Sequence, residues 1–470
     1  MVFSSNVFLF VFLPLFLIVY YLLPFRARSA WILLASYGLY GWWRFDFLWL
    51  LIGVTAVSYL LALAIESARQ PHRRWLLIAG VAANLCTLAY FKYANFGVES
   101  FNAVIASLGF QPFSWAPVLL PIGLSFFVFH AISYLADVYK KEVAATQHPL
   151  DFAAFIALFP HLIAGPVLKY HLLADQFRHR DHTFENFSLG AQRFMVGFCK
   201  KVLIADSISP LVTAAFASPD PTFADAWLGA LAYTLQLYFD FSGYSDMAIG
   251  LAAMMGFRFP ENFNHPYISR SITEFWKRWH MSLSSWLREY LYIALGETAG
   301  AGTDLPQPVA DHGPWRPVAW CQLDLRPVGA WHGSILATER YLGERKLWSP
   351  VAPVLSITGT MVLVVLGWVM FRAADVGEAF RIYQGMLGLN GWGLSDALSW
   401  QVTGSQLTVM MLAGVLVYVA PSWEQWAART RATVGQRLQT TAYLAVAPLF
   451  LLAVLKLSAQ SYTPFLYFQF

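Results

Sequence analysis

The sequence predicts an all-α, polytopic membrane protein, because its composition and the spacing of its apolar runs both differ from those of soluble chains. Of its 470 residues, 58% are hydrophobic and only 12% are charged, whereas soluble domains carry about 25% charged residues. Apolar runs long enough to cross a bilayer recur along the chain, separated by short loops. We therefore expect one membrane domain over residues 1–470 with about ten to twelve membrane helices, besides re-entrant or interfacial helices.

The basic residues predict how the first spans are oriented. The apolar run at residues 1–25 has no basic start and no small-residue cleavage site, so we expect it to remain as an anchor. Basic loops follow the first, third and fifth apolar runs, at residues 26–28, 69–74 and 140–141. By the positive-inside rule these loops are cytoplasmic, and residues 91–117, after the fourth run, form a loop on the opposite side.

Two segments in the middle of the chain are poor candidates for ordinary spans. Residues 151–170 are interrupted by Pro160 and by a later Gly-Pro pair, and a charged stretch follows them. This pattern predicts a re-entrant or interfacial helix on the cytoplasmic side. Residues 189–212 carry Lys200 and Lys201 in their middle, so this segment is also expected at the interface.

A later span contains carboxylates. Residues 226–257 are long enough to cross the membrane, yet they include Asp240 and Asp246. Charged groups are costly in lipid, so both should face protein or water and pair with hydroxyls or cations. Three further helices are expected nearer the C-terminus, at residues 351–371, 406–420 and 441–457.

The stretch at residues 273–292, TEFWKRWHMSLSSWLREYLY, is the most unusual in the chain. Its tryptophans and leucines follow helical spacing, while lysine, arginine and histidine are spread around them. We predict a single helix without a wholly apolar face, which lies at an interface or lines an aqueous cavity because it is too polar for lipid.

Several common classes of site are excluded by the sequence. Cys86, Cys199 and Cys321 have neither paired nor metal-ligand spacing, so we expect no disulfide framework and no metal site. There is no glycine-rich phosphate loop and no serine nucleophile elbow. The net charge of +4 does not indicate nucleic-acid binding, and no such partner is expected.

Three blocks of this sequence resemble the signature sequences of the membrane-bound O-acyltransferase (MBOAT) family. They are FDFSGYSDMAIG at residues 239–250, NFNHPYISRSITEFWKRWHMSLSSWLREYLYI at residues 262–293 and GAWHG at residues 329–333. The opening MVFSSNVFLF, HLIAGPVLKY from His161 and the ending TPFLYFQF are similar to its alginate O-acetylase branch.

The resemblance implies a multihelical fold with a passage through the bacterial inner membrane. It also implies that acetyl is taken from a cytoplasmic donor, expected to be acetyl-CoA, and delivered to alginate in the periplasm. No bound cofactor is expected. The expected partners are the lipid bilayer, a polysaccharide acceptor, and periplasmic and membrane proteins of alginate acetylation.

The family pattern has two histidines, of which His280 matches the first. The second belongs to a Leu-Trp-His-Gly block about forty residues downstream, and this sequence lacks it. Residues 297–328 are proline-rich and without helical periodicity, and we interpret them as a frame-shifted reading between two compensating single-nucleotide errors. Pro317 to Cys321 can be written CCU GUG GCA UGG UGC, which reads Leu-Trp-His-Gly after a one-base shift. If residues 297–328 are genuine, an inactive variant is expected instead.

The two surviving histidines are the candidate catalytic residues. Imidazole can deprotonate a sugar hydroxyl or carry an acetyl group near neutral pH. His280 is the first candidate, with a structural hydrogen-bonding role as the alternative. His332 in GAWHG is the second, and its alternative is a packed residue.

The other candidate residues are polar or aromatic positions near these histidines. Arg278 and Arg288 are candidates for binding donor phosphates, or for extending toward lipid headgroups. Lone His130 and His161 are expected to pack in the core or at an interface. The residues expected to line or brace the passage, or to form a structural polar network, are Asp240, Ser242, Tyr244, Asp246 and Trp276.

Two other function classes stay open from the sequence. A related acyltransferase, such as one that transfers D-alanine to teichoic acid, should share the central block and diverge at the two ends. A transporter or structural subunit should show paired half-domains, and no internal duplication is visible.

Overall fold

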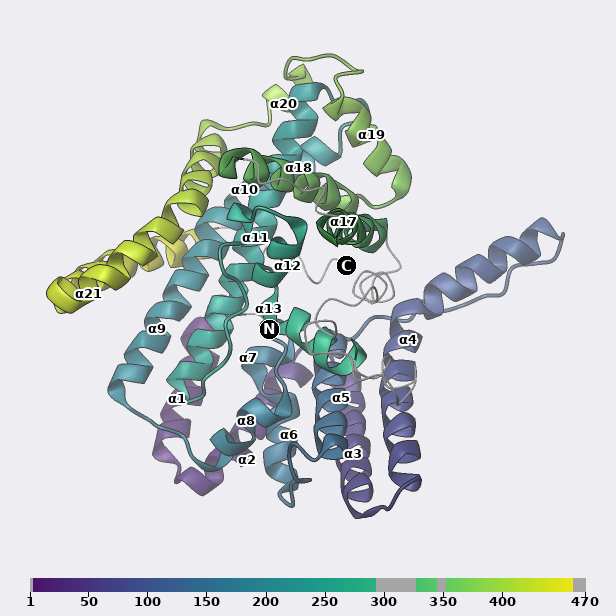
Figure 1. Ribbon diagram of the computed structural model, residues 1–470, viewed down its shortest axis with the longest axis vertical. Helices are drawn as coiled ribbons and strands as arrows, with labels where there is room; N and C mark the ends of the chain where they lie inside the picture. The colour runs from purple at the N-terminus through teal and green to yellow at the C-terminus, as the bar shows by residue number, and fades with distance from the viewer. Residues whose placement is uncertain (1–2, 293–326, 345–351, 460–470) are drawn as a thin grey trace. The chain divides into compact units, whose positions relative to one another are not determined.

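The computed structural model describes residues 3–292, 327–344 and 352–459 (Figure 1). These residues form helices joined by turns and loops, and no β-strand occurs among them. The predicted all-α class is therefore confirmed. The chain divides into two compact units, which are described separately.

The first unit comprises residues 1–188 and 251–259. Within it, α3, α4 and α5 pack on one another, and α6 packs on α2 and α3. Its core is aromatic: Phe16 and Phe159 lie with ring centroids 5.0 Å apart, and both are buried. The helices are η1 (Phe8–Phe12), α1 (Leu13–Leu22), α2 (Phe25–Gly41), α3 (Phe45–Ser67), α4 (His72–Ser107), α5 (Leu124–Lys140), α6 (Pro149–Ala157), α7 (Phe159–Leu162) and α8 (Tyr170–Arg178).

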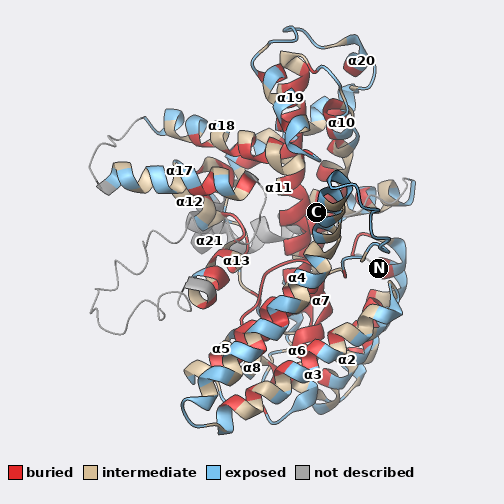
Figure 2. Cartoon of the chain, turned by 90° about the vertical axis from the view of Figure 1, so that its right-hand side faces the viewer, coloured by how far each residue is buried: buried red, intermediate tan, exposed pale blue. Residues whose placement is uncertain are grey.

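The second unit comprises residues 189–250 and 260–470. Figure 2 shows that α11 is buried along most of its length. The helices are α9 (Phe184–Cys199), η2 (Lys200–Ala205), α10 (Asp206–Phe216), α11 (Phe223–Met254), η3 (Pro266–Ile268), α12 (Ile272–Arg278), α13 (Met281–Trp286), η4 (Leu287–Tyr292), α17 (Pro327–Glu344), α18 (Pro353–Arg372), α19 (Val376–Met386), α20 (Asp396–Ser399) and α21 (Gly404–Ala459). Helix α9 begins in the first unit, and α11 ends there.

Four described helices are long and apolar enough to cross a membrane: Phe45–Ser67, His72–Ser107, Pro353–Arg372 and Gly404–Ser422. Phe8–Leu22 and Val446–Ala459 are apolar but shorter. The count of ten to twelve membrane helices stays a prediction. The first and third of these spans have mean hydropathies of 2.3 and 2.2, so most of their surface suits lipid.

The structure corrects two predicted boundaries. Helix α4 continues to Ser107, so the loop expected at residues 91–117 is helical over its first half. The two helices expected at residues 406–420 and 441–457 belong to one helix, α21, which runs from Gly404 to Ala459. Both predictions ended a helix where the hydrophobicity of the sequence falls. Polar residues also form helices, so the backbone hydrogen bonding of each helix continues beyond that point.

Residues 151–170 are interrupted as predicted. Helix α6 ends at Ala157, and the short helix α7 follows it from Phe159 to Leu162. His161 is buried, and its Nε2 lies 2.9 Å from the carbonyl oxygen of Phe155. His130 is also buried, and its Nε2 accepts a hydrogen bond from the backbone N–H of Leu168. The predicted core packing of both histidines is confirmed, whereas the re-entrant placement stays a prediction.

Small residues bring α9 and α11 into close contact. A Cβ atom on Gly243 would lie 2.7 Å from the carbonyl oxygen of Gly197, and one on Gly250 would lie 2.5 Å from that of Gly190. Such distances leave no room for a side chain, so glycine is required at the crossing. The approach places Asp246, between the two α11 glycines, against the basic residues of α9.

Candidate functional site

His280 lies at a break between two helices. The single helix predicted for residues 273–292 is wrong: α12 ends at Arg278, and α13 begins at Met281. His280 adopts φ 46° and ψ 53°, a left-handed conformation that is uncommon for a residue with a side chain. The neighbouring extended segment stabilises the break, because the N–H of Asn264 donates to Arg278 O and the N–H of Met281 donates to Asn262 O, each at 2.9 Å.

Asn262 fixes the orientation of the His280 ring. Its Oδ1 lies 2.9 Å from His280 Nδ1, and it also accepts hydrogen bonds from the hydroxyl and the backbone N–H of Ser282. Because a backbone N–H only donates, this amide atom is the oxygen, and His280 Nδ1 must carry the proton. The other ring nitrogen, Nε2, is then the basic atom, and the described part of the chain supplies it with no hydrogen bond.

The surroundings keep the His280 ring neutral. The side chain is 6% exposed, and the Phe241 ring lies edge-on to it with centroids 4.8 Å apart. Burial lowers the pKa of His280 to about 3, because a charged imidazolium is poorly solvated there. A neutral imidazole with an unprotonated Nε2 can act as a base or as a nucleophile.

His332 lies on α17 in an aromatic environment. It is 2% exposed, and its ring centroid is 5.3 Å from that of Trp276 and 6.0 Å from that of Trp368. Neither ring nitrogen has a hydrogen-bond partner within the described ranges. A Cβ atom on Gly367 would lie 2.5 Å from His332 Nε2, so the ring packs directly on α18. These contacts are those of a packed residue, and the catalytic role of His332 stays a prediction.

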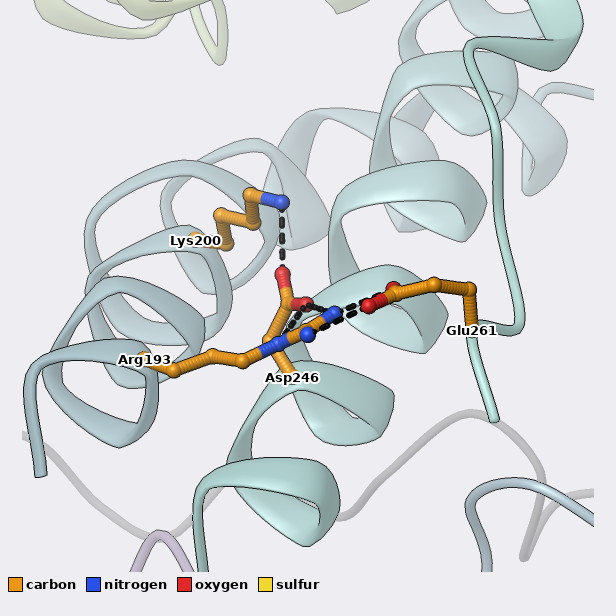
Figure 3. A network of polar contacts seen from close by, with 4 residues as sticks. All are labelled: Arg193, Lys200, Asp246 and Glu261. Atoms are coloured by element: carbon orange, nitrogen blue, oxygen red, sulfur yellow. Dashed lines mark hydrogen bonds and ion pairs between the residues drawn. The ribbon is translucent and has the colours of Figure 1, made fainter. Parts of the chain in front are cut away.

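Asp246 forms the centre of a charged network within the second unit (Figure 3). Its Oδ1 accepts from Nε and Nη2 of Arg193 at 3.1 and 2.9 Å, and its Oδ2 lies 2.7 Å from Lys200 Nζ. The same guanidinium donates to Glu261 at 2.6 Å. Glu261 directly precedes Asn262, so this network holds the start of the segment that carries the His280 partner.

Asp240 is paired as well. It is 1% exposed and lies 2.9 Å from Lys201 Nζ, which also bonds Asp206 at 2.6 Å. The prediction that Asp240 and Asp246 pair with cations is thereby confirmed. Lys201 has a side chain only 3% exposed, so it serves a buried ion pair. The interfacial placement of residues 189–212 stays a prediction.

The remaining predicted residues have varied surroundings. Ser242 and Tyr244 are buried on α11, and the Ser242 hydroxyl has no partner among the described residues. Trp276 packs on His332. Arg278 bonds Glu274 at 2.7 Å one helical turn away, which occupies part of its guanidinium. Arg288, in η4, is exposed, and its predicted role in phosphate binding remains a prediction.

Sequence reasoning missed Asn262 and Glu339. Asn262 stands in the NFNHPY block, but no local pattern shows that an asparagine 18 residues away reaches His280. The Glu339 carboxylate accepts from the N–H groups of Ile272 and Thr273 at 2.7 and 2.9 Å, and from the Thr273 hydroxyl at 2.8 Å. It thus supplies acceptors for amides at the N-terminus of α12, which lack partners within the helix.

One group of side chains has the composition of a metal site. Asp137, Glu142 and His171, in the first unit, offer ligand atoms within 4.8 Å of one another. An ion pair accounts for the geometry: His171 Nδ1 lies 3.0 Å from Asp137 Oδ2, and this hydrogen bond raises the pKa of His171. The residues described around His280 and His332 include no comparable group.

Comparison with known proteins identifies the class. Residues 39–303 match the membrane-bound O-acyltransferase family, MBOAT. The chain is 50% identical to the probable alginate O-acetylase AlgI of Azotobacter vinelandii over the whole of both chains. It is 31% identical to the peptidoglycan O-acetyltransferase of Helicobacter pylori, over 90% of this chain and 87% of that protein. It is also 31% identical to the teichoic acid D-alanyltransferase of Bacillus subtilis, over 46% of this chain and 58% of that protein.

This chain therefore belongs to the membrane-bound O-acyltransferase family. It is a membrane protein and an O-acyltransferase, as the resemblance of its signature blocks predicted.

Proposed function

We propose that this chain takes acetyl from cytoplasmic acetyl-CoA and passes it across the bacterial inner membrane for O-acetylation of alginate in the periplasm. The observation that carries the proposal is the 50% identity to an alginate O-acetylase from end to end. The partners proposed for this transfer are the polysaccharide acceptor and membrane and periplasmic proteins of alginate acetylation.

The arrangement of His280 suits the chemistry of acetyl transfer. Asn262 holds Nδ1 of His280, so Nε2 can take the proton of a sugar hydroxyl. The hydroxyl oxygen of the sugar then attacks the carbonyl carbon of the thioester. A C–O bond forms, the C–S bond breaks, and the proton passes to the departing thiolate. The Asn262 Nδ2 group is buried without an acceptor among described residues, so it is available to stabilise the oxyanion.

Transfer of a different acyl group is less well supported. The teichoic acid D-alanyltransferase of Bacillus subtilis aligns with 46% of this chain, whereas the alginate O-acetylase of Azotobacter vinelandii aligns with all of it. A match to only part of the chain agrees with the expectation that a D-alanyltransferase shares the central block and diverges at the two ends.

The proposal is tested by the acetyl content of exported alginate. A host strain without the gene should export alginate with little or no ester-linked acetate, and expression of this chain should restore it. Acetate that stays at the same level with and without the gene would contradict the proposal. Restored acetylation would also show that residues 297–328, as printed, are compatible with activity.

The hydrogen bond between Asn262 and His280 predicts a change in pH dependence. In Asn262→Asp, the new carboxylate raises the pKa of His280, because it favours the charged imidazolium. The base must be neutral to act, so acetyl transfer should fall about tenfold for each pH unit below the raised pKa. The unchanged protein should show no such decline near neutral pH, since its His280 has a pKa of about 3.

The measurement is the initial rate of acetyl transfer by purified protein as a function of pH. Gln401→Glu, which adds a carboxylate at an exposed position, is the matched control and should leave the profile unchanged. If Asn262→Asp and the unchanged protein give the same profile, His280 does not act as the base through Nε2.

A further inference from the structure

Two arginines in the first unit gather around one set of aromatic rings. Arg28, near the start of α2, places its Cζ 4.9 Å from the Tyr20 ring and 6.0 Å from the Phe25 ring. Arg180, after α8, places its Cζ 5.0 Å from the same Phe25 ring and 4.3 Å from the Phe257 ring. Two cations therefore share the Phe25 ring although they are far apart in the sequence.

No carboxylate among the described residues forms an ion pair with either arginine, although Asp151 acts on the Arg180 charge without contacting it. Arg28 Nε donates to the carbonyl oxygen of Leu23, and Arg180 Nη1 donates to that of Gln176, each at 3.2 Å. Asp181, next to Arg180, instead lies 3.9 Å from Arg258. Two positive charges in one place repel each other, so the arrangement favours an anion.

Arg180 also has donors without acceptors. Its Nε and Nη2 atoms are buried, and the described residues give neither a hydrogen bond. Stacking on Phe25 and Phe257 occupies the faces of the guanidinium but not its N–H edge. A buried charged donor without a partner is costly, so an acceptor from outside the chain would stabilise this side chain.

The polar groups beside the arginines are already used. The Tyr20 hydroxyl donates to the carbonyl oxygen of Met255 at 2.7 Å and lies 2.9 Å from His182 Nε2. Burial and the charges of Arg28 and Arg180 lower the pKa of His182, so this imidazole stays neutral and adds no further charge. The pair of guanidinium groups is thus the charged feature of the cluster.

We propose that Arg28 and Arg180 form a binding site for a phosphate ester. Guanidinium groups bind phosphate oxygens through paired N–H donors, and two of them match its charge. Arg28 lies at the start of α2, in the basic segment that the positive-inside rule assigns to the cytoplasm. The ester is either the headgroup of a phospholipid or a phosphate of a soluble thioester donor. Leu22 and Phe184, 79% and 86% exposed, lie close to the cluster in sequence and provide apolar surface for a lipid.

The test measures ligand binding by the full chain in an uncharged detergent free of phosphate. The probes are phosphatidylglycerol in mixed micelles, coenzyme A and inorganic phosphate, and the readout is the shift in Tm with probe concentration. Arg28→Gln combined with Arg180→Gln should weaken the fitted Kd at least about tenfold, because two charge-assisted contacts are lost. Arg26→Gln combined with Arg178→Gln, an exposed pair of the same charge, is the control and should bind normally.

The probes distinguish the two sources. A response to phosphatidylglycerol alone identifies a lipid headgroup, whereas a response to coenzyme A without one to phosphatidylglycerol identifies the donor. Equal affinities in the double variant and its control overturn the proposal, as does the absence of any response in the unchanged protein.

A second variant covers the case in which the double variant does not fold. Arg180→Lys keeps the charge and loses the paired donors. It should retain fewer phosphatidylglycerol molecules, or less coenzyme A, than the unchanged protein in native mass spectrometry. Equal retention would again overturn the proposal.

Discussion

Replacing His280 with alanine is expected to abolish acetylation while leaving the protein inserted and abundant. The substitution removes the Nε2 atom that we propose acts on the sugar hydroxyl, and general-base catalysis contributes about 10²–10⁴-fold to a rate. The surrounding fold should survive, because the extended segment still bonds Arg278 O and the N–H of Met281. The measurement is ester-linked acetate in exported polymer, with the amount of membrane protein determined in parallel.

Two further variants separate the effect of losing the imidazole from the effect of disturbing the backbone. The backbone of His280 adopts a left-handed conformation, which asparagine tolerates better than alanine does. His280→Asn should therefore lose activity with less disturbance of the fold. His148→Ala removes an exposed histidine and should leave acetylation unchanged. Acetylation retained in His280→Ala would reduce this residue to a structural role.

Replacing Asp246 with leucine is expected to destabilise the second unit more than any exposed substitution. The carboxylate bonds both Arg193 and Lys200, and its side chain is 16% exposed. Removing one partner of a buried ion pair costs about 3–5 kcal/mol, because the remaining charge is left without compensation. Arg193 retains its ion pair with Glu261, so we expect a loss of stability in the lower part of this range. The apparent Tm of detergent-solubilised protein measures the effect.

The loss of stability in Asp246→Leu should come from Lys200, whose charge is left without a partner. Combining Asp246→Leu with Lys200→Met removes that charge and should recover part of the lost Tm. Asp220→Leu, at an exposed position without an ion pair among described residues, is the matched control. A double variant no more stable than Asp246→Leu alone would show that Lys200 is not the source of the destabilisation.

The two α11 carboxylates illustrate what could be predicted from the sequence. Burial of Asp240 and Asp246 in an apolar stretch is costly, and that cost alone predicts cationic partners. The identity of the partners could not be predicted from the sequence. Arg193, Lys200 and Lys201 come from a segment 39–53 residues away, which packs closely on α11 through glycines. Close approach of two backbones leaves no signal in hydrophobic periodicity.

The helix break at His280 could not be predicted for a related reason. Periodicity favours one helix through residues 273–292, and no proline or glycine interrupts it. The break is stabilised by the hydrogen bonds that Arg278 and Met281 make with the backbone of Asn264 and Asn262, which replace those that a continuous helix would make. Tertiary hydrogen bonding thus overrides local propensity at the residue proposed to carry the chemistry.

The missing second histidine is a separate question. The anomalous segment at residues 297–328 lies outside the described residues except for its last two positions. The frame-shift hypothesis therefore stays a prediction, and sequencing the gene across this region decides it. A clean read that encodes these residues as printed would leave a genuine variant.

The contact between α17 and α12 bears on the gene itself. Glu339, encoded after the anomalous segment, bonds amides of Ile272 and Thr273, which are encoded before it. An uncompensated insertion or deletion between them would replace this glutamate with an unrelated residue. This contact supports one reading frame for the codons on both sides, in which any nucleotide errors in between add up to a whole number of triplets.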